Sequence, residues 1–327
     1  MDTQSPVRFG IAGVGRIAGA HLLAIDALSP QEAVLSAVAT RKSQLPFELP
    51  EGGRVHARYG DLLEDPSVDA VIICYPNAMH YDAVLSAIEA GKHVLVEKPI
   101  GMNAAEVSEM VEAAERRGVQ LMSAQSRRFS DAIEAVRDAI PEIGPIIRIV
   151  INFLVRFDGP PTGWWNDPES AGDLIVHLQG SHSVDTIVWL LEAEPNYVAA
   201  RTANVNKQFT GSDEADILLG FEGGVSAAVH LSLNTSPFLH ELVVVGTEGS
   251  MTMLEEPTGV PFGFKYRLSV NGQARIDGAQ DPSLYTKQLA EFVAALKEER
   301  PPRASGRDVL RTTRVLDSIL SAARAQN

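Results

Sequence analysis

The sequence contains a single cysteine, Cys74, which excludes any disulfide within its 327 residues and is typical of proteins from reducing compartments. No run of about 18 apolar residues occurs, so no segment has the length and hydropathy of a membrane-spanning helix. Residues 1–6 carry neither a basic segment nor an apolar stretch, and we therefore expect no secretion signal. These shortages predict a cytoplasmic protein without a membrane partner.

Basic residues are also in short supply. Lys and Arg number 28 against 42 Asp and Glu, which gives a formal net charge of −14. An acidic chain repels nucleic acids and anionic lipid surfaces, so we expect neither as a partner. The length, in contrast, suffices for two domains that each bury a core of their own.

In residues 1–125, short β-rich runs alternate with longer helical patterns, which predicts βαβ units and a parallel sheet. The predicted helices cover residues 17–28, 81–90 and 104–117. The predicted strands cover residues 7–12, 34–39, 70–74, 93–96 and 120–124. We therefore predict a dinucleotide-binding domain of the Rossmann type, a doubly wound α/β sheet, over residues 1–125.

The pattern changes in residues 126–327. Alternating apolar and polar residues predict half-solvated antiparallel strands at 146–153, 197–205, 215–221, 225–233, 240–245 and 266–270. Helices are predicted within 171–191, at 282–299 and at 307–325. We expect an α+β domain with an open, largely antiparallel sheet that serves substrate binding and oligomerisation, and whose last helix can pack back on the first domain. The open face of that sheet predicts a homodimer or homotetramer.

A glycine motif follows the first predicted strand. Gly13 allows a tight turn, Gly15 lets the backbone approach a pyrophosphate, and Ala18 lets the next helix pack on the strand. The pyrophosphate then lies at a helix N-terminus, where free N–H groups favour anions. Such spacing also arises by chance, but the strand before it and the helix after it favour dinucleotide binding. The predicted cofactor residues of this turn are Gly13, Gly15, Arg16, Ile17 and Ala18.

The end of the second predicted strand bears on which nicotinamide cofactor binds. A carboxylate there would hold the ribose 2′-hydroxyl of NAD, but the strand ends in Thr40, Arg41 and Lys42. Thr40 can hydrogen-bond a 2′-phosphate, and Arg41 can pair with that phosphate and stack on the adenine. The alternative is a solvated basic turn. We predict that NADP(H) is preferred over NAD(H).

The loop after the strand at 70–74 is a second candidate contact with the cofactor. It contains Tyr75, Pro76, Asn77 and His80, at the sheet edge where such folds bind ligands. The alternative interpretation is that Asn77 caps the next helix and His80 lies on the surface.

Lys98 follows the apolar run at 93–96 and stands between Glu97 and Pro99. Desolvation lowers the pKa of a lysine toward neutrality, and a neighbouring carboxylate raises it again. That balance suits a proton donor to a carbonyl or alkoxide oxygen. Alone, the motif would indicate a surface lysine in a turn; together with the glycine turn it indicates a catalytic residue.

A predicted helix in the second half carries His182 and Asp185, which are three residues apart and share a face. His177 and His182 are five residues apart, which places them on different faces of an α-helix, so we expect no metal site. Trp164 and Trp165, in a Pro/Gly-rich loop, can stack on a sugar ring or form local core.

In order and spacing, these motifs resemble the Gfo/Idh/MocA oxidoreductases, the family of glucose–fructose oxidoreductase and the inositol dehydrogenases. The resemblance extends over nearly the whole chain, and its motifs are residues 13–18, 76–80, 97–99, 127–129 and 180–185. It implies hydride transfer between a nicotinamide and a secondary alcohol or ketone of a sugar, inositol or related polyol.

By this resemblance Lys98 would be the catalytic lysine, hydrogen-bonded to the reacting oxygen, and His182 the second acid/base group. Glu97 would order its loop, and the peptide between Lys98 and the following proline would be cis. Asn77 and His80 would line the nicotinamide side of the pocket. The predicted substrate contacts are Lys98, Arg128, Trp164, Trp165, His177 and Asp185.

One position departs from the family pattern D-x-G-x-H-x-x-D. Matching its glycine and histidine to Gly180 and His182 puts Leu178 where the first Asp stands. A second register pairs Asp173 with His177 but loses the glycine and the second Asp. The segment before Gly180 is also a residue or two longer than usual. The lysine and His182 would then act alone, or with His177 or Asp173 in place of the missing carboxylate.

We therefore predict an NADP(H)-preferring dehydrogenase or reductase that acts on CH–OH groups. Two alternatives stay open. One is a catalytically inactive, cofactor-binding regulator or sensor of the same fold, which the leucine at position 178 favours. The other is a reductase of non-sugar diols or diketones.

Overall fold

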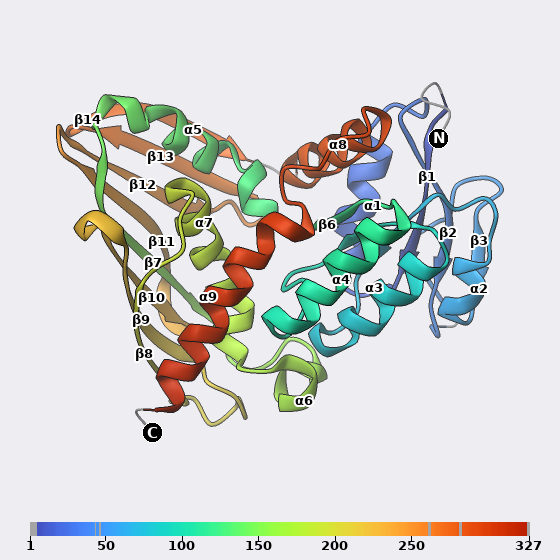
Figure 1. The fold of residues 1–327 in the computed structure, drawn as a ribbon, viewed down its shortest axis with the longest axis horizontal. Coiled ribbons are helices and arrows are strands. Elements are labelled where there is room, and N and C mark those ends of the chain that lie inside the picture. Colours follow the sequence, from blue (N-terminus) through green and yellow to red (C-terminus); the bar gives the residue numbers. More distant parts are fainter. Residues whose placement is uncertain (1–4, 43, 46, 261–262, 281–282, 326–327) are drawn as a thin grey trace. The chain divides into compact units, whose positions relative to one another are not determined.

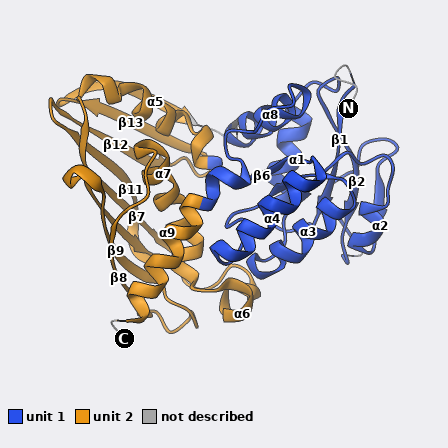
Figure 2. Ribbon diagram, in the orientation of Figure 1, with its two compact units in different colours: residues 1–126, 282–310 blue, residues 127–281, 311–327 orange. Residues whose placement is uncertain are grey.

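The chain folds into two units, formed by residues 1–126 with 282–310 and by residues 127–281 with 311–327 (Figure 2). The computed structural model describes residues 5–42, 44–45, 47–260, 263–280 and 283–325. Residues 1–4 of the N-terminus for which we expected no signal, and Pro282 at the predicted start of a helix, lie outside the described residues.

Unit 1 contains a six-stranded sheet with the order β3-β2-β1-β4-β5-β6, whose neighbouring strands pair in parallel (Figure 1). Its strands are β1 (Val7–Ala12), β2 (Ala33–Ala39), β3 (Arg54–His56), β4 (Ala70–Ile73), β5 (His93–Val96) and β6 (Leu121–Ser123). Its helices include α1 (Ala18–Ala27), α2 (Tyr59–Leu63), α3 (His80–Glu89), α4 (Ala104–Arg117) and α8 (Ser283–Lys297). The strand order reverses between β1 and β4, which is where open α/β sheets bind ligands. The predicted Rossmann-type sheet is confirmed.

Both ends of helix α4 are set by residues that act on the neighbouring backbone. Asn103 caps its start, because the Asn103 side chain accepts a hydrogen bond from the Glu106 backbone N–H at 3.0 Å. Gly118 ends the helix in the left-handed conformation, with φ +70°. Both ends coincide with the prediction. The edge strand β3 and the short helix α2 were not predicted, because β3 has three residues and no apolar alternation.

The division between the units differs from the prediction at the C-terminal end. The first boundary, between residues 126 and 127, lies one residue from the predicted one, but α8 belongs to unit 1. Phe292 of α8 packs against Phe9 of β1, with ring centroids 6.3 Å apart. Tyr285 contacts the ring of His21 on α1 edge-on. This packing joins segments more than 260 residues apart along the chain, and no local sequence pattern predicts it.

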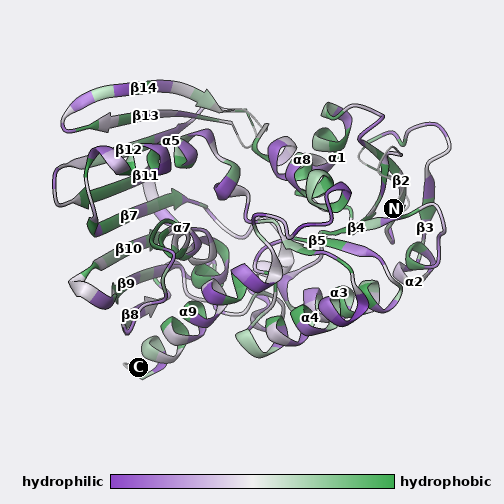
Figure 3. Ribbon diagram, turned by 45° about the horizontal axis from the view of Figure 1, so that its top comes forward, coloured by the Kyte–Doolittle hydropathy of each residue, from purple (hydrophilic) through white to green (hydrophobic). Residues whose placement is uncertain are grey.

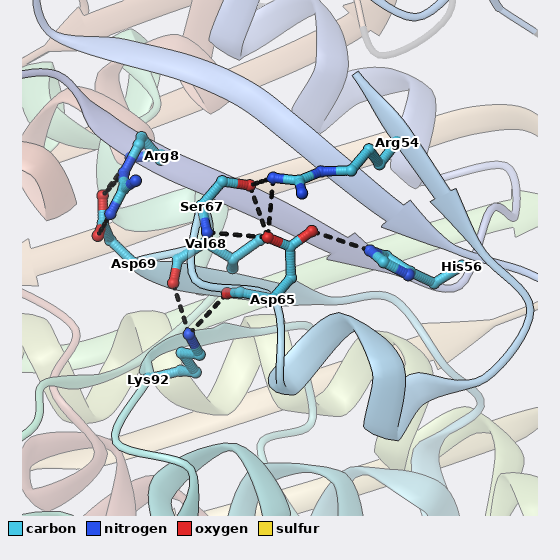
Figure 4. A network of polar contacts seen from close by, with 8 residues as sticks. All are labelled: Arg8, Arg54, His56, Asp65, Ser67, Val68, Asp69 and Lys92. Carbon is cyan, nitrogen blue, oxygen red and sulfur yellow. Dashed lines mark hydrogen bonds and ion pairs between the residues drawn. The ribbon is translucent and has the colours of Figure 1, made fainter. Parts of the chain in front are cut away.

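A polar network holds the loop that leads into β4 (Figure 4). Asp65 accepts hydrogen bonds from His56 at 2.9 Å and from the Ser67 hydroxyl at 2.7 Å, and pairs with Arg54 at 2.9 Å. Burial opposes ionisation of Asp65, but these partners outweigh it and lower its pKa to about 2. Lys92 donates to the carbonyls of Asp65 and Val68. These contacts fix the segment that leads into the amino end of β4.

Unit 2 is built on an eight-stranded sheet with the order β14-β13-β12-β11-β7-β10-β9-β8. Neighbouring strands pair antiparallel except β7 and β10, which are parallel. Its strands are β7 (Ile146–Arg156), β8 (Tyr197–Ala203), β9 (Glu214–Gly220), β10 (Ser226–Ser232), β11 (Asn234–Gly246), β12 (Ser250–Pro257), β13 (Phe264–Val270) and β14 (Gln273–Gln280). The predicted α+β domain with a largely antiparallel sheet is confirmed.

One face of this sheet carries the core of unit 2. Alternate residues such as Ile149, Ile151, Leu242 and Val244 are buried, whereas their neighbours on the strands are not. Helices lie along one face of the sheet (Figures 1 and 3). The covering helices are α5 (Asp131–Ala139), α7 (Ser181–Leu191) and α9 (Gly306–Arg324). α5, β12 and β14 were not predicted, since the strands contain polar and turn-forming residues that mask the alternation.

Candidate functional site

The glycine turn between β1 and α1 has the shape of a phosphate cradle. Gly13 has φ +88°, and a Cβ there would lie 2.8 Å from the Tyr75 ring. Gly15 faces open space, because no atom lies within 4 Å of where its Cβ would be. Helix α1 starts after Ile17 with no side-chain cap and no acidic residue in its first turn. This turn fits a dinucleotide pyrophosphate, which would take the place that a side chain at Gly15 would fill.

The loops after β2 and β4 meet beside this turn. Burial raises the pKa of Tyr75, and the positive charge of Arg41 partly offsets it, which places the end of β2 close to the Tyr75 ring. Thr40 is fixed by its backbone N–H, which donates to the His56 carbonyl at 3.0 Å, and its hydroxyl accepts from the Lys42 N–H. The side chain of Arg41 is exposed. Three of the predicted cofactor residues, Thr40, Arg41 and Tyr75, therefore lie near one another, and the guanidinium of Arg41 provides a positive charge at the end of β2.

His80, the first residue of α3, connects two loops. Its Nδ1 lies 2.7 Å from the Pro99 carbonyl oxygen and its Nε2 lies 2.9 Å from the Tyr75 carbonyl oxygen, and the side chain is fully buried. Burial lowers the pKa of His80, although both carbonyls favour the protonated ring. The His80 side chain thus connects the loop after β4 with the loop after β5 through its two ring nitrogens. The alternative that His80 lies on the surface is therefore wrong. Its contact with a nicotinamide stays a prediction, as does that of the buried Asn77.

Lys98 lies at the carboxyl end of β5, and its peptide bond to Pro99 is cis, as the resemblance implied. Desolvation lowers the pKa of Lys98 to about 8, the negative charge of Glu97 opposes the shift, and the positive charge of Arg16 adds to it. The lysine and the glycine turn therefore share one electrostatic environment. A lysine with a pKa near neutrality can both give and take a proton at physiological pH.

Glu97 is held in place by a residue that sequence reasoning missed. Its Oε1 lies 2.8 Å from Nε2 of His21, and its Oε2 accepts from the backbone N–H of Lys98 at 3.2 Å. His21 lies on the buried side of α1, and its only signal in the sequence is a polar residue on an apolar helix face.

On unit 2, the segment that seemed too long for the family pattern forms a π-helix, Val176–Gly180, directly before α7. A π-helical turn absorbs an additional residue within a helix. His177 lies in this turn and is buried, with Nδ1 3.0 Å from the Asp173 carbonyl oxygen. The Asp173 carboxylate accepts from the Ser212 hydroxyl and so ties two segments of the backbone together. His182 follows in the first turn of α7 and is partly exposed.

Asp185 and Arg128 form a buried pair. Arg128 donates to the two carboxylate oxygens from Nε at 2.8 Å and from Nη2 at 2.7 Å, and both side chains are 1% exposed. The Thr312 hydroxyl donates to the same carboxylate at 2.8 Å. This arrangement ties α7 to α9 and to the start of unit 2. The substrate contacts predicted for Arg128 and Asp185 stay predictions.

Arg127, the neighbouring arginine, is also buried in an ion pair. It donates to Glu255 at 2.7 Å, and His240 lies 2.6 Å from the same carboxylate. Burial opposes ionisation of Glu255, but the charges of these two partners hold its pKa at about 2. The first residue of unit 2 is thus fixed to the sheet.

The tryptophan pair is divided between core and surface. Trp165 is 4% exposed and packs edge-on against Phe157, with centroids 5.3 Å apart. Trp164 is partly exposed beside it. Of the two, Trp164 keeps the geometry for stacking on a ligand, and that role stays a prediction.

Comparison with known proteins shows the family of this chain. Residues 7–125 match the model of an oxidoreductase family with an NAD-binding Rossmann fold, and residues 133–252 match the GFO/IDH/MocA C-terminal domain. The chain belongs to the Gfo/Idh/MocA family of oxidoreductases. It is 30% identical to 1,5-anhydro-D-fructose reductase of Ensifer adhaerens over 92% of this chain and 91% of that protein.

A second relative of this Gfo/Idh/MocA chain is trans-1,2-dihydrobenzene-1,2-diol dehydrogenase of Mus musculus, 31% identical over 82% of this chain and 79% of that protein. Among solved structures, aldose-aldose oxidoreductase from Caulobacter crescentus superimposes with a TM-score of 0.84 at 24% identity, and covers 98% of each chain. That similarity shows the shared fold.

The described residues also bear on metal binding and on membrane insertion. Among them, no group of three or more His, Cys, Asp or Glu side chains is placed to hold a metal ion. The described helices also include none that is long and apolar enough to cross a membrane.

Proposed function

We propose that this Gfo/Idh/MocA oxidoreductase prefers NADP(H) and interconverts a secondary alcohol and a ketone on a sugar, inositol or related polyol. The observation that carries the proposal is the position of Lys98 at the carboxyl end of β5, at a cis peptide bond and near Arg16 of a glycine turn whose shape fits a phosphate. When bound, the nicotinamide supplies or accepts the hydride at the substrate carbon. The glycine turn, Tyr75 and Arg41 would hold the cofactor.

The part of Lys98 is to move the hydroxyl proton. Below its pKa the ammonium of Lys98 donates a proton to the oxygen of a ketone, and above it the amine accepts the proton of an alcohol. Glu97 keeps negative charge beside the lysine, and Arg16 keeps positive charge near it. On unit 2, His182 would be the second acid/base group, and Trp164 would stack on the substrate ring.

The names of the two relatives support different substrate classes. One is named as a reductase of 1,5-anhydro-D-fructose, a sugar ketone, and the other as a dehydrogenase of an aromatic dihydrodiol. The first favours the polyol assignment, and the second favours a non-sugar diol as the alternative candidate.

A substrate panel decides between them. Sugars, inositols, sugar ketones and non-sugar diols and diketones are offered with each nicotinamide, and the absorbance of the reduced nicotinamide is followed. Turnover of a sugar or inositol with NADP(H) supports the proposal. Turnover of non-sugar diols alone overturns the substrate class. Tight cofactor binding with no turnover of any compound instead supports the regulator or sensor that Leu178 favours.

The cofactor preference makes a prediction for Arg41. Arg41→Ala is expected to raise the Kd of NADP(H) about 10- to 100-fold, because one charge-assisted interaction with a phosphate contributes about 1.5–3 kcal/mol. The Kd of NAD(H), which lacks the 2′-phosphate, serves as the internal control and should stay unchanged. Fluorescence titration of the variant and the unaltered protein measures both. Equal Kd values for the two cofactors in the unaltered protein would contradict the preference.

We also propose that the protein is a homodimer or homotetramer formed through the uncovered face of the unit 2 sheet. On that face Val243 of β11 lies opposite Val150 of β7, and Leu239 lies opposite Leu154. These side chains are partly exposed because no described helix of unit 2 packs on them.

Val243→Glu is expected to shift the sedimentation coefficient toward that of the monomer, with Glu222→Gln in an exposed turn as control. A monomeric unaltered protein at all concentrations would refute the assembly.

A further inference from the structure

His21 and Glu97 form a buried contact directly next to Lys98, and the proposed function gives His21 no role. Both groups are buried: the side chain of His21 is 0% exposed and that of Glu97 is 10% exposed. The two carboxylate oxygens have different partners, since Oε1 meets His21 Nε2 at 2.8 Å and Oε2 accepts from the Lys98 N–H. A carboxylate accepts hydrogen bonds and donates none, so the proton of the contact resides on Nε2. His21 thus fixes which way the charge next to Lys98 points.

His21 is itself held rigidly. It lies on α1, the helix that begins at the glycine turn, and the ring of Tyr285 from α8 packs edge-on against it with centroids 5.6 Å apart. Its Nδ1 is buried and meets no hydrogen-bond partner among the residues that the structure describes. The histidine therefore has one polar contact there, and that contact is the Glu97 carboxylate.

We propose that His21 is a positioning residue for Lys98, which holds the Glu97 carboxylate beside the lysine and so keeps the lysine protonated at the working pH. The proposal rests on the catalytic part assigned to Lys98 in the proposed function. Without a donor at Nε2, a buried carboxylate either takes up a proton or turns away from the site. Either event removes negative charge next to Lys98, and the lysine loses its proton at a lower pH.

Three charged or titratable groups from other elements also act on Glu97 or Lys98. Arg16, from the glycine turn, acts on Lys98 and favours its neutral form. His80 on α3 interacts with both Glu97 and Lys98. The thiol of Cys74, after β4, is buried near Glu97, and burial first and that negative charge second raise its pKa well above its usual value. The contacts that hold the two Glu97 carboxylate oxygens come from His21 Nε2 and from the Lys98 N–H.

The test compares the pH dependence of kcat/KM for ketone reduction in four proteins. The unaltered enzyme should lose activity as pH rises through about 8, since a proton donor must carry its proton. His21→Leu and Glu97→Gln should both move this limb to lower pH by about one unit or more. His21→Gln keeps an N–H near the Nε2 position and should restore the limb. The double variant His21→Leu/Glu97→Gln should show no larger shift than either single change.

A matched control exists in the same unit. His56 makes the same kind of contact, with Nε2 2.9 Å from the Asp65 carboxylate, at the edge of the sheet. His56→Leu should lower stability and leave the pH limb in place. A role of His21 in stability alone would likewise lower activity at every pH without moving the limb, and that outcome would overturn the proposal.

A second readout needs no turnover. The rate at which Lys98 is acylated by a small anhydride, followed by mass spectrometry of its peptide, rises as the amine loses its proton. The midpoint of that rise should fall in His21→Leu and in Glu97→Gln, and should be unchanged in His56→Leu. If the unaltered enzyme turns over no substrate, the proposed function fails, while the acylation midpoint still tests His21. If turnover is present and both midpoints stay in place, the positioning role is wrong.

Discussion

Lys98→Met is expected to lower kcat/KM about 10²- to 10⁴-fold, the usual contribution of a positioned general acid or base. Methionine keeps the unbranched shape of the side chain but can neither hold nor release a proton. The Kd of the cofactor should change little, because the pyrophosphate cradle is built from the glycine turn and not from the lysine. Steady-state kinetics and cofactor titration on the same preparation separate the two effects.

Lys207→Met is the control for this change, since Lys207 is an exposed lysine on unit 2 that donates hydrogen bonds to Asn204 in its own loop. It should leave both kcat/KM and cofactor affinity unchanged. Should Lys98→Met retain most of its activity, Lys98 would not be the group that moves the proton. Should it lose cofactor affinity in step with activity, Lys98 would act by binding the cofactor.

Asp185→Asn is expected to destabilise the protein by about 3–5 kcal/mol, the usual cost of breaking a buried ion pair on one side. The asparagine would occupy the same volume but leave the guanidinium of Arg128, which is 1% exposed, without its counter-charge. The hydrogen bond from Thr312 would also be weakened. Urea unfolding followed by tryptophan fluorescence measures the change, because Trp189 lies close to the Arg128 guanidinium.

The control for this prediction is Asp158→Asn. Asp158 pairs with Arg156 at a similar distance, 2.9 Å, but its side chain is 86% exposed, so its loss should hardly alter stability. The comparison also separates two roles of Asp185. A protein that unfolds at the same urea concentration as the unaltered one, yet has a raised KM, would mean that Asp185 contacts substrate and is not a structural residue.

Some parts of this fold are encoded locally and others are not. Helix α4 was predicted to the residue because Asn103 and Gly118 act on the backbone within one turn of where they stand. The glycine turn was predicted because a tight turn and a close approach to a ligand both require residues without a side chain. Gly13 has a positive φ, and open space lies where a side chain of Gly15 would be. The edge strand β3 escaped prediction because its pairing with β2, and not its own residues, makes it a strand.

Some residues of the candidate site were likewise predictable from their neighbours in the sequence, and others depend on contacts that only the fold creates. Lys98 was predicted from neighbours in the sequence, Glu97 and Pro99, whereas His21 is 76 residues away from Glu97, and only the fold brings the two side chains together. The longer segment before Gly180 was noted in the sequence, but only the backbone shows that a π-helix takes it up. His80 was predicted to lie at the site, yet its two carbonyl partners come from different loops and could not be inferred from spacing.

The most direct test of the central claim is the pH dependence of a single turnover. Enzyme saturated with the reduced nicotinamide is mixed with a sugar ketone, and the rate at which the reduced nicotinamide disappears is measured across the pH range. We predict that the rate falls as pH rises through about 8, and that Lys98→Met abolishes this dependence together with most of the rate. A rate that shows the same midpoint and the same magnitude in Lys98→Met would contradict the assignment of the proton transfer to Lys98.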